Sequence, residues 1–154
     1  MIFTATYGHT NLIARDWQAL SAFYEQVFGC TPVPPLRDLT GESLERGTAV
    51  PGARLQGVHL RLPGFGDAGP TLEIFTYSTV ADIVGQEPAA ADRLGFGHIA
   101  FIVSDVSTAR AAVVRAGGSV HGDIVSTPTG SRTVTWAYVR DPEGNLVELQ
   151  SWSS

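Results

Sequence analysis

The sequence predicts an α+β protein built from two βαβββ modules, and three observations support this. Residues 8–29 (GHTNLIARDWQALSAFYEQVFG) resemble residues 97–118 (GHIAFIVSDVSTARAAVVRAGG), since each begins with Gly-His, has Asp seven residues after the His, and ends in Gly. Strand-like patterns then follow both stretches. The composition, 44% hydrophobic and 16% charged, is typical of a compact globular protein.

The length of 154 residues suits a single domain, which we expect to contain both modules. We place the first βαβββ module at 7–77 and the second at 96–152. Residues 78–95 read as a linker with some helical character, interrupted by Pro88.

Each module is predicted to open with a strand that carries its histidine on the face away from the helix. Because side chains alternate along a strand, Leu12 and Phe101 point to one face while His9 and His98 point to the other.

A helix should follow each of these strands. Asp16 and Asp105 stand where an N-cap accepts hydrogen bonds from free backbone amides. Gly29 and Gly117 can take the left-handed conformation that ends a helix. The apolar stripes of the two helices are predicted at Leu20, Phe23, Tyr24 and Val27, and at Val106, Ala109, Ala112, Val113 and Ala116.

Three further strands are predicted in each module. In the first module they are a weak one near 31–34, then 54–62 and 71–77; in the second they are 119–125, 133–139 and 145–152. The stretch DPEGN is predicted to join the last two strands as a hairpin. Residues 35–53 read as a mobile excursion that can act as a lid or be merely a long loop.

Four side chains at matched positions of the two modules suggest a metal site. His9 and His98 open the first strands, and Glu73 and Glu148 each lie between apolar residues near the module end. A lone strand histidine is more often hydrogen-bonded or exposed, but four residues at matched repeat positions are not independent accidents. If the modules are pseudo-symmetric halves, the four meet, and imidazole with carboxylate suits one divalent ion of Zn, Ni, Co, Mn or Fe with positions left open for catalysis.

These residues resemble the vicinal oxygen chelate superfamily, which includes glyoxalase I, methylmalonyl-CoA epimerase, fosfomycin resistance proteins, bleomycin-binding proteins and extradiol dioxygenases. The resemblance covers nearly the whole chain and is strongest in GHIAFIVSDV, RAGG, VRDPEGN and LVELQ, which are similar to segments of bacterial glyoxalase I. It implies a glyoxalase-like fold, in which the two modules form a cupped, mostly antiparallel sheet around a metal.

Within that superfamily a full His, Glu, His, Glu ligand set resembles glyoxalase I more than the dioxygenases or the fosfomycin enzymes, which use three ligands. The resemblance implies proton transfer next to a carbonyl held by a Lewis-acidic metal. Glu148 or Glu73 would be the catalytic carboxylate that moves the proton, and the residues alone do not decide which.

The substrate pocket departs from that family. Bacterial glyoxalase I holds glutathione with an arginine and an asparagine at the places of Ile13 and Tyr77, so we expect a different substrate. By alternation, the candidate substrate-binding residues are Asn11, His59, Arg61, Phe75, Tyr77, Ile102, Gln150 and Trp152.

Several of these candidates also have a simpler interpretation. Arg61 can pair with a substrate carboxylate or phosphate, or cover apolar surface with its stem. His59 can be an extra acid or base, or a structural histidine. The aromatic residues can equally be core or dimer contacts.

The leading hypothesis is therefore a metal-dependent lyase or isomerase that acts on a small oxygenated substrate. The alternatives are a metal-free ligand-sequestering protein of the antibiotic-resistance type, an Fe(II) extradiol-type dioxygenase, and an acyl-CoA epimerase. The epimerase commonly has glutamine at the place of Glu73.

Charge and composition exclude other classes. A net charge of −5 gives no attraction to nucleic acid or to anionic lipid. Cys30 is the only cysteine, which excludes an intrachain disulfide and a thiolate-rich metal site. No stretch approaches the roughly 20 apolar residues of a membrane span, and the first residues do not resemble a signal peptide, so we expect a cytoplasmic protein. The exposed sheet edges and half-open cup of the expected fold, together with the resemblance, favour a homodimer.

Overall fold

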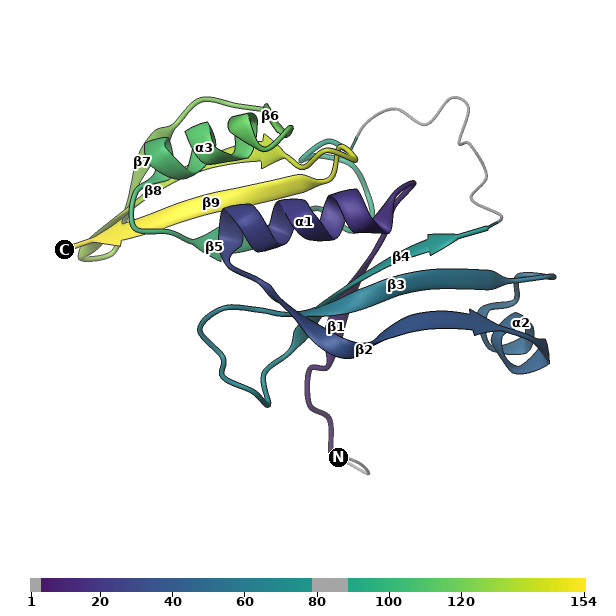
Figure 1. Ribbon diagram of the computed structural model, residues 1–154. Coiled ribbons are helices and arrows are strands. Elements are labelled where there is room, and N and C mark those ends of the chain that lie inside the picture. The colour runs from purple at the N-terminus through teal and green to yellow at the C-terminus, as the bar shows by residue number, and fades with distance from the viewer. Residues whose placement is uncertain (1–3, 79–88) are drawn as a thin grey trace. The chain divides into compact units, whose positions relative to one another are not determined.

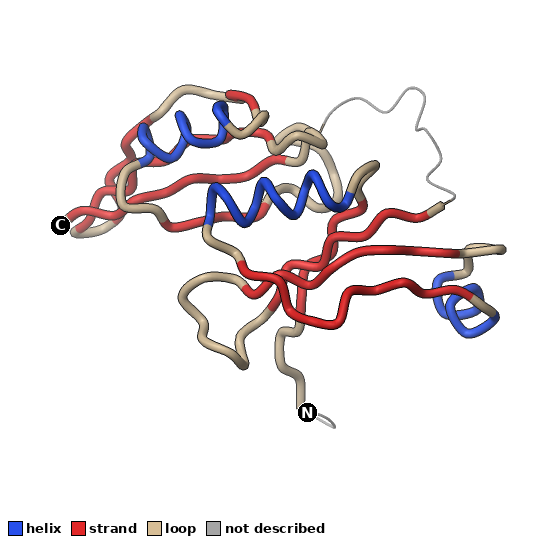
Figure 2. Tube along the Cα trace, viewed as in Figure 1, coloured by secondary structure: helices blue, strands red, loops and turns tan. Residues whose placement is uncertain are grey.

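The computed structural model describes residues 4–78 and 89–154. It divides into two compact units, residues 1–82 and 83–154. Each unit has its own mixed sheet, of four strands in the first and five in the second, as Figures 1 and 2 show. The predicted α+β class is confirmed, and most strand pairs in both sheets are antiparallel.

The first unit contains two helices and four strands among its described residues. In chain order they are β1 (His9–Ile13), α1 (Trp17–Phe28), β2 (Thr31–Thr40), α2 (Glu42–Thr48), β3 (Arg54–Arg61) and β4 (Thr71–Tyr77). The sheet order is β1-β4-β3-β2, with β1 parallel to β4 and the other pairs antiparallel. The order places β1 and β3 on either side of β4.

The second unit repeats this plan. It contains β5 (Ile99–Ile102), α3 (Val106–Arg115), β6 (Ser119–Val120), β7 (Val125–Thr129), β8 (Arg132–Arg140) and β9 (Leu146–Ser153). Here β5 runs parallel to β9, while β9 and β8 are antiparallel neighbours. In both units, therefore, the first strand pairs with the last.

The predicted helix ends are confirmed. Asp16 Oδ1 accepts hydrogen bonds from the amides of Gln18 and Ala19 at 2.9 and 3.0 Å, and Asp105 Oδ1 accepts one from the Thr108 amide at 2.6 Å. Gly29 ends α1 with a φ of 70°, in the left-handed region. In α3, Gly117 follows the Ala116 C-cap with a φ of 94°, so both predicted helices begin and end near the residues that the sequence indicates.

Each sheet buries one face under its long helix. In the first unit α1 packs on β3 and β4, and in the second unit α3 packs on β8 and β9. The buried side chains include Leu12, Leu20, Phe23, Tyr24, Leu60, Leu72 and Ile74 in the first unit, and Val106, Val113, Ala137, Val139, Val147 and Leu149 in the second. The opposite face of each sheet carries the polar side chains of the candidate site.

Two sequence expectations are wrong. Residues 35–53 were expected to form a mobile excursion, but β2 continues to Thr40 and α2 follows it. Proline is tolerated here because β2 is an edge strand whose pairing with β3 shifts register between Val33 and Arg37. The predicted strand 119–125 is divided into β6 and β7.

The hairpin predicted for DPEGN is confirmed between β8 and β9. The buried carboxylate of Asp141 accepts hydrogen bonds from the amides of Glu143 and Asn145, and Gly144 has a φ of 90°. Of the predicted linker, residues 79–88 lie outside the described residues. In the part of the chain that the structure describes, no helix is long and apolar enough to span a membrane.

Candidate functional site

Glu73 lies at the centre of the open face of the first sheet. In the strand register Glu73 stands beside Asn11 of β1 on one side and His59 of β3 on the other. His9 of β1 and Thr71 of β4 are also register partners, and they lie two residues before Asn11 and Glu73. Alternation in three adjacent strands therefore gathers these side chains on one face.

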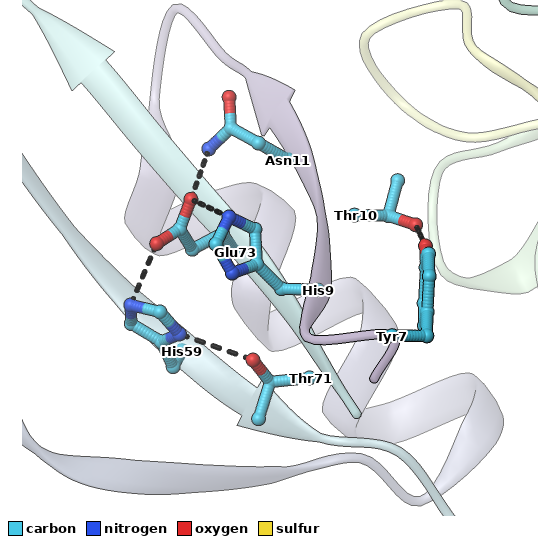
Figure 3. Close-up of polar contacts among 7 residues, drawn as sticks. All are labelled: Tyr7, His9, Thr10, Asn11, His59, Thr71 and Glu73. Atoms are coloured by element: carbon cyan, nitrogen blue, oxygen red, sulfur yellow. Dashed lines mark hydrogen bonds and ion pairs between the residues drawn. The ribbon is translucent and has the colours of Figure 1, made fainter. Parts of the chain in front are cut away.

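Three side chains contact the Glu73 carboxylate, as Figure 3 shows. His9 Nε2 lies 3.3 Å from Oε2, and Asn11 Nδ2 donates a hydrogen bond to the same oxygen at 3.1 Å. His59 Nε2 lies 2.8 Å from the other oxygen, Oε1. The carboxylate is held on both oxygens, and its side chain is only 13% exposed.

His59 is held at both ring nitrogens. Its Nδ1 lies 3.1 Å from the hydroxyl of Thr71, while Nε2 faces Glu73. Burial lowers the pKa of His59, an effect that the nearby Glu73 carboxylate opposes and that Arg37 and His9 add to. The neutral form is therefore favoured, and a carboxylate can only accept, so Nε2 is assigned the hydrogen.

The second sheet has a simpler pair. His98 Nε2 lies 3.1 Å from Glu148 Oε2, and both side chains are partly exposed. The ring of Tyr138, which stands opposite Glu148 in the register, lies 5.0 Å from the ring of His98 in an edge-to-face contact. Burial, and secondarily the Glu148 charge, raises the pKa of Tyr138, so its hydroxyl stays protonated.

The four residues predicted to hold one ion stand as two His–Glu pairs, one in each unit, and their donor atoms are of types that bind metal ions. Adjacent ligands of an octahedral ion at about 2.1 Å lie about 3 Å apart. The separations of 3.3 Å for His9 with Glu73 and 3.1 Å for His98 with Glu148 match this value. Imidazole and carboxylate donors also fit the divalent ions expected from the sequence.

Neither pair makes a complete site by itself. Within residues 4–78 and 89–154, no three side chains of His, Cys, Asp or Glu form a group suited to a metal ion. In the first unit His9 and His59 approach different oxygens of Glu73.

Among the substrate-binding candidates of the first unit, Arg61 and Phe75 have clear surroundings. Arg61 Nε is buried without a hydrogen-bond partner among the described residues, and the nearest carboxylate, that of the exposed Asp67, lies 3.5 Å away. Phe75 packs against Gly57, where a Cβ atom would come within 2.4 Å of the Phe75 ring. Tyr77 lies at the end of β4 and is partly exposed.

The candidates of the second unit lie near the ends of β5 and β9. Ile102 is exposed. Gln150 Oε1 accepts a hydrogen bond from Trp152 Nε1 at 2.7 Å, and the guanidinium of Arg132 lies 4.9 Å from the Trp152 ring centre. The Trp152 ring is thus held from two sides while part of it remains exposed.

The sequence analysis missed three residues of these faces. Trp136 and Tyr138 extend from His98 along β8 as a row of edge-to-face rings, with centroids 5.5 Å apart. Their signal is the alternation in TVTWAYV, where the intervening Ala137 and Val139 are buried. Thr71, the partner of His59, lies two residues before Glu73 and shares its face by the same rule.

A family model matches most of the chain. The model described as the Glyoxalase/Bleomycin resistance protein/Dioxygenase superfamily matches residues 6–149. The chain belongs to this superfamily. The superfamily includes many enzymes and often binds a divalent metal.

Solved structures of this superfamily have the same fold. A glyoxalase family protein from Bacillus cereus is 18% identical, with a TM-score of 0.81 over 100% of this chain and 99% of that one. A glyoxalase family protein from Enterococcus faecalis is 22% identical, with a TM-score of 0.58 over 97% and 99% of the two chains. A glyoxalase/bleomycin resistance protein/dioxygenase family enzyme from Burkholderia phytofirmans is 20% identical, with a TM-score of 0.56 over 96% and 98%. No curated protein matches the chain.

Proposed function

We propose that the protein is a divalent-metal-dependent lyase or isomerase that moves a proton next to a carbonyl of a small oxygenated substrate. The observation that carries this proposal is the pairing of imidazole and carboxylate at the same place in both sheets, with nitrogen and oxygen atoms 3.3 and 3.1 Å apart. Two equivalent pairs supply four donors of the type that divalent ions take.

His9, Glu73, His98 and Glu148 would hold the ion. When bound, the ion supplies Lewis-acid polarisation of the substrate carbonyl. The catalytic carboxylates are Glu73 and Glu148, and we assign the proton transfer to Glu148. Its carboxylate has one side-chain partner among the described residues, His98, whereas Glu73 has three.

In the proposed reaction Glu148 takes a proton from the carbon beside the carbonyl and returns it to the neighbouring carbon. The donor carbon carries a hydroxyl, whose proton passes to the carbonyl oxygen. One C–H and one O–H bond break and one of each forms, so the step needs no external oxidant or reductant. The Tyr138 ring, which stands opposite Glu148 and packs edge-to-face against His98, restricts water on this side.

The substrate is proposed to differ from the glutathione hemithioacetal. Ile13 and Tyr77 replace the two polar residues that the resemblance to glyoxalase I would require. Asn11, Arg61, Phe75 and Tyr77 on the first sheet, and Ile102, Gln150 and Trp152 on the second, are the proposed substrate contacts. The Arg61 guanidinium, whose Nε faces only the exposed Asp67 carboxylate at 3.5 Å among the described residues, suits an anionic group on the substrate.

The metal content of protein purified without added metal tests this proposal. We expect one Zn, Ni, Co, Mn or Fe ion per chain by elemental analysis. Because the proposed site needs both pairs, His9→Ala and His98→Ala should each abolish binding of that ion. His121→Ala is the matched control, since within residues 4–78 and 89–154 His121 contacts Arg140 and the ring of Tyr138 and no carboxylate. An ion that stays bound in either ligand variant would show that one pair holds it alone and would contradict the proposal.

Activity is then tested with α-ketoaldehydes, acyl-CoA esters and catechols in deuterated water. Deuterium incorporation beside a carbonyl, dependent on the ion, supports the proposed proton transfer. Oxygen consumption with a catechol would instead identify a dioxygenase, and exchange with acyl-CoA esters alone would identify an epimerase.

A metal-free ligand-sequestering protein is the second candidate. The row of rings at Trp136 and Tyr138 and the partly exposed ring of Trp152 favour it, since aromatic faces bind planar or cationic ligands without an ion. Purified protein that contains no metal, gains none on dialysis against Zn²⁺, and still quenches its tryptophan fluorescence with such ligands would select this alternative.

A further inference from the structure

The Glu73 carboxylate has an imidazole neighbour that is not one of the four proposed ligands. His59 Nε2 lies 2.8 Å from Oε1, which is closer than His9 comes to Oε2 at 3.3 Å. The two imidazoles thus take opposite oxygens of one carboxylate, as Figure 3 shows. This arrangement leaves Oε2 on the side of His9.

The orientation of His59 is fixed by its surroundings. Thr71 contacts Nδ1 from the adjacent strand, and the ring of Phe75 lies 6.0 Å from the His59 ring in an edge-to-face contact. The side chain is 17% exposed, against 49% for His9. A ring with both nitrogens engaged and one edge packed against an aromatic ring has little rotational freedom.

The backbone places His59 for this contact. His59 and Glu73 are direct cross-strand partners in the antiparallel pair of β3 and β4, so their Cβ atoms lie about 5 Å apart. The second unit has no such contact, because the residue opposite Glu148 is Tyr138, whose ring contacts His98. The third imidazole is therefore a feature of the first pair alone within the described residues.

We propose that His59, oriented by Thr71, is a positioning residue that donates a hydrogen bond from Nε2 to Glu73 Oε1 and so directs Oε2 toward the bound ion. This inference rests on the proposed function. Hydrogen-bond partners of metal ligands fix the orientation of the ligands and commonly contribute 10- to 100-fold to metal affinity. The contact to Glu73 needs only the hydrogen on Nε2, which the protonated imidazole and one neutral tautomer both carry.

The hydrogen bond itself is tested in metal-free protein by imidazole ¹⁵N NMR. The His59 signals are identified as those absent from the spectrum of His59→Gln. We expect a protonated Nε2 and an Nδ1 that accepts from the Thr71 hydroxyl, and a population of the other tautomer in Thr71→Val. An unprotonated Nε2 in the wild-type protein would overturn the proposal.

Positioning is tested by metal affinity, measured with Zn²⁺ in competition with a fluorescent chelator. We expect His59→Ala to weaken binding about 10- to 100-fold. His59→Gln keeps an N–H donor near the position of Nε2, so its affinity should stay within about threefold of the wild type. His121→Ala serves as control, and the unfolding temperatures of the metal-free variants report any general loss of stability.

The outcomes separate this inference from the proposed function. If the wild-type protein binds Zn²⁺ and His59→Ala binds it equally well, the positioning role is wrong while the metal site stands. If the wild-type protein binds no ion, the proposed function fails, and the proposal that His59 directs Glu73 toward an ion fails with it. The NMR result then decides only whether His59 donates to Glu73. Equal weakening by His59→Ala and His59→Gln would also contradict the proposal, because it would show that the N–H donor contributes nothing.

Discussion

Glu73 and Glu148 occupy equivalent places in the two sheets but have different cross-strand neighbours. Glu73 stands between Asn11 and His59, and both side chains contact its carboxylate. Glu148 stands between Ala100 and Tyr138 in the register, and its one side-chain hydrogen-bond or ion-pair partner among the described residues is His98. The repeated fold therefore presents one restrained carboxylate and one freer carboxylate.

This difference predicts different effects of the same substitution. Glu148→Gln keeps the side-chain shape but removes the proton acceptor, so we expect turnover to fall by at least about 100-fold. Glu73→Gln should mainly weaken metal binding, because it disturbs the carboxylate that three side chains hold. Steady-state kinetics of each variant and its metal affinity, measured in parallel, check this.

The matched control is Glu42→Gln, which removes an exposed carboxylate of α2 that pairs with Arg46. It should leave turnover and metal affinity unchanged. Undiminished turnover in Glu148→Gln, with circular dichroism showing an intact fold, would contradict the proposed mechanism.

The replacement of polar glutathione contacts by Ile13 and Tyr77 predicts poor activity on methylglyoxal with glutathione. Ile13 is half exposed at the end of β1 and offers no hydrogen bond. We expect kcat/KM for this pair to be at least about 100-fold below that for the best substrate found in the screen, since two lost polar contacts cost about 1.5 kcal/mol each. Brisk formation of lactoylglutathione, followed spectrophotometrically, would contradict this prediction and show that residues other than those at positions 13 and 77 bind glutathione.

The sequence predicts much of the fold because its signals are local. Asp16 and Gly29 mark the ends of α1, and the strand β4 coincides with the predicted range 71–77. The errors occur where local signals are weak or misleading. Pro34 and Pro35 make the sequence of β2 look unlike a strand, although they lie where its pairing with β3 shifts register. Gly122 lies in the break between β6 and β7.

The candidate site is predictable only in part. Alternation correctly places His9, Asn11, His59 and Glu73 on one face, but it cannot give the direction in which a side chain turns on that face. That His59 points to Glu73 rather than toward a substrate depends on the rotamers set by Thr71 and Phe75. The four-ligand set remains a proposal that rests on the repeat.

Stability at alkaline pH should depend on Cys30. Burial, with a smaller contribution from Glu25, raises the pKa of this thiol from 9.0 to about 11. Above pH 9 the unfolded chain loses the proton while the folded chain keeps it, so the free energy of unfolding falls as the pH rises from 9 toward 11.

Urea unfolding from pH 8 to pH 11 measures this effect. Relative to Cys30→Ala, which lacks the thiol, the wild-type protein should lose about 2 kcal/mol of additional stability by pH 11. Tyrosine ionisation affects both proteins alike and cancels in the comparison. Parallel pH curves for the two proteins would show that the thiol ionises equally easily in the folded and unfolded states.

The hairpin before β9 should contribute strongly to stability through Asp141. This carboxylate is 3% exposed, and it accepts hydrogen bonds at 2.9 Å from two backbone amides and from Asn145 Nδ2. Asp141→Ala leaves these donors without their acceptor, so we expect a loss of about 3 kcal/mol in the free energy of unfolding. Asn145→Ala removes only the side-chain donor and should cost about 1 kcal/mol.

The exposed Asp123→Ala is the matched control, with a change within about 0.5 kcal/mol, and urea unfolding of the three variants ranks them. An Asp141→Ala variant as stable as Asp123→Ala would mean that the turn is set by Gly144 and the strand pairing alone.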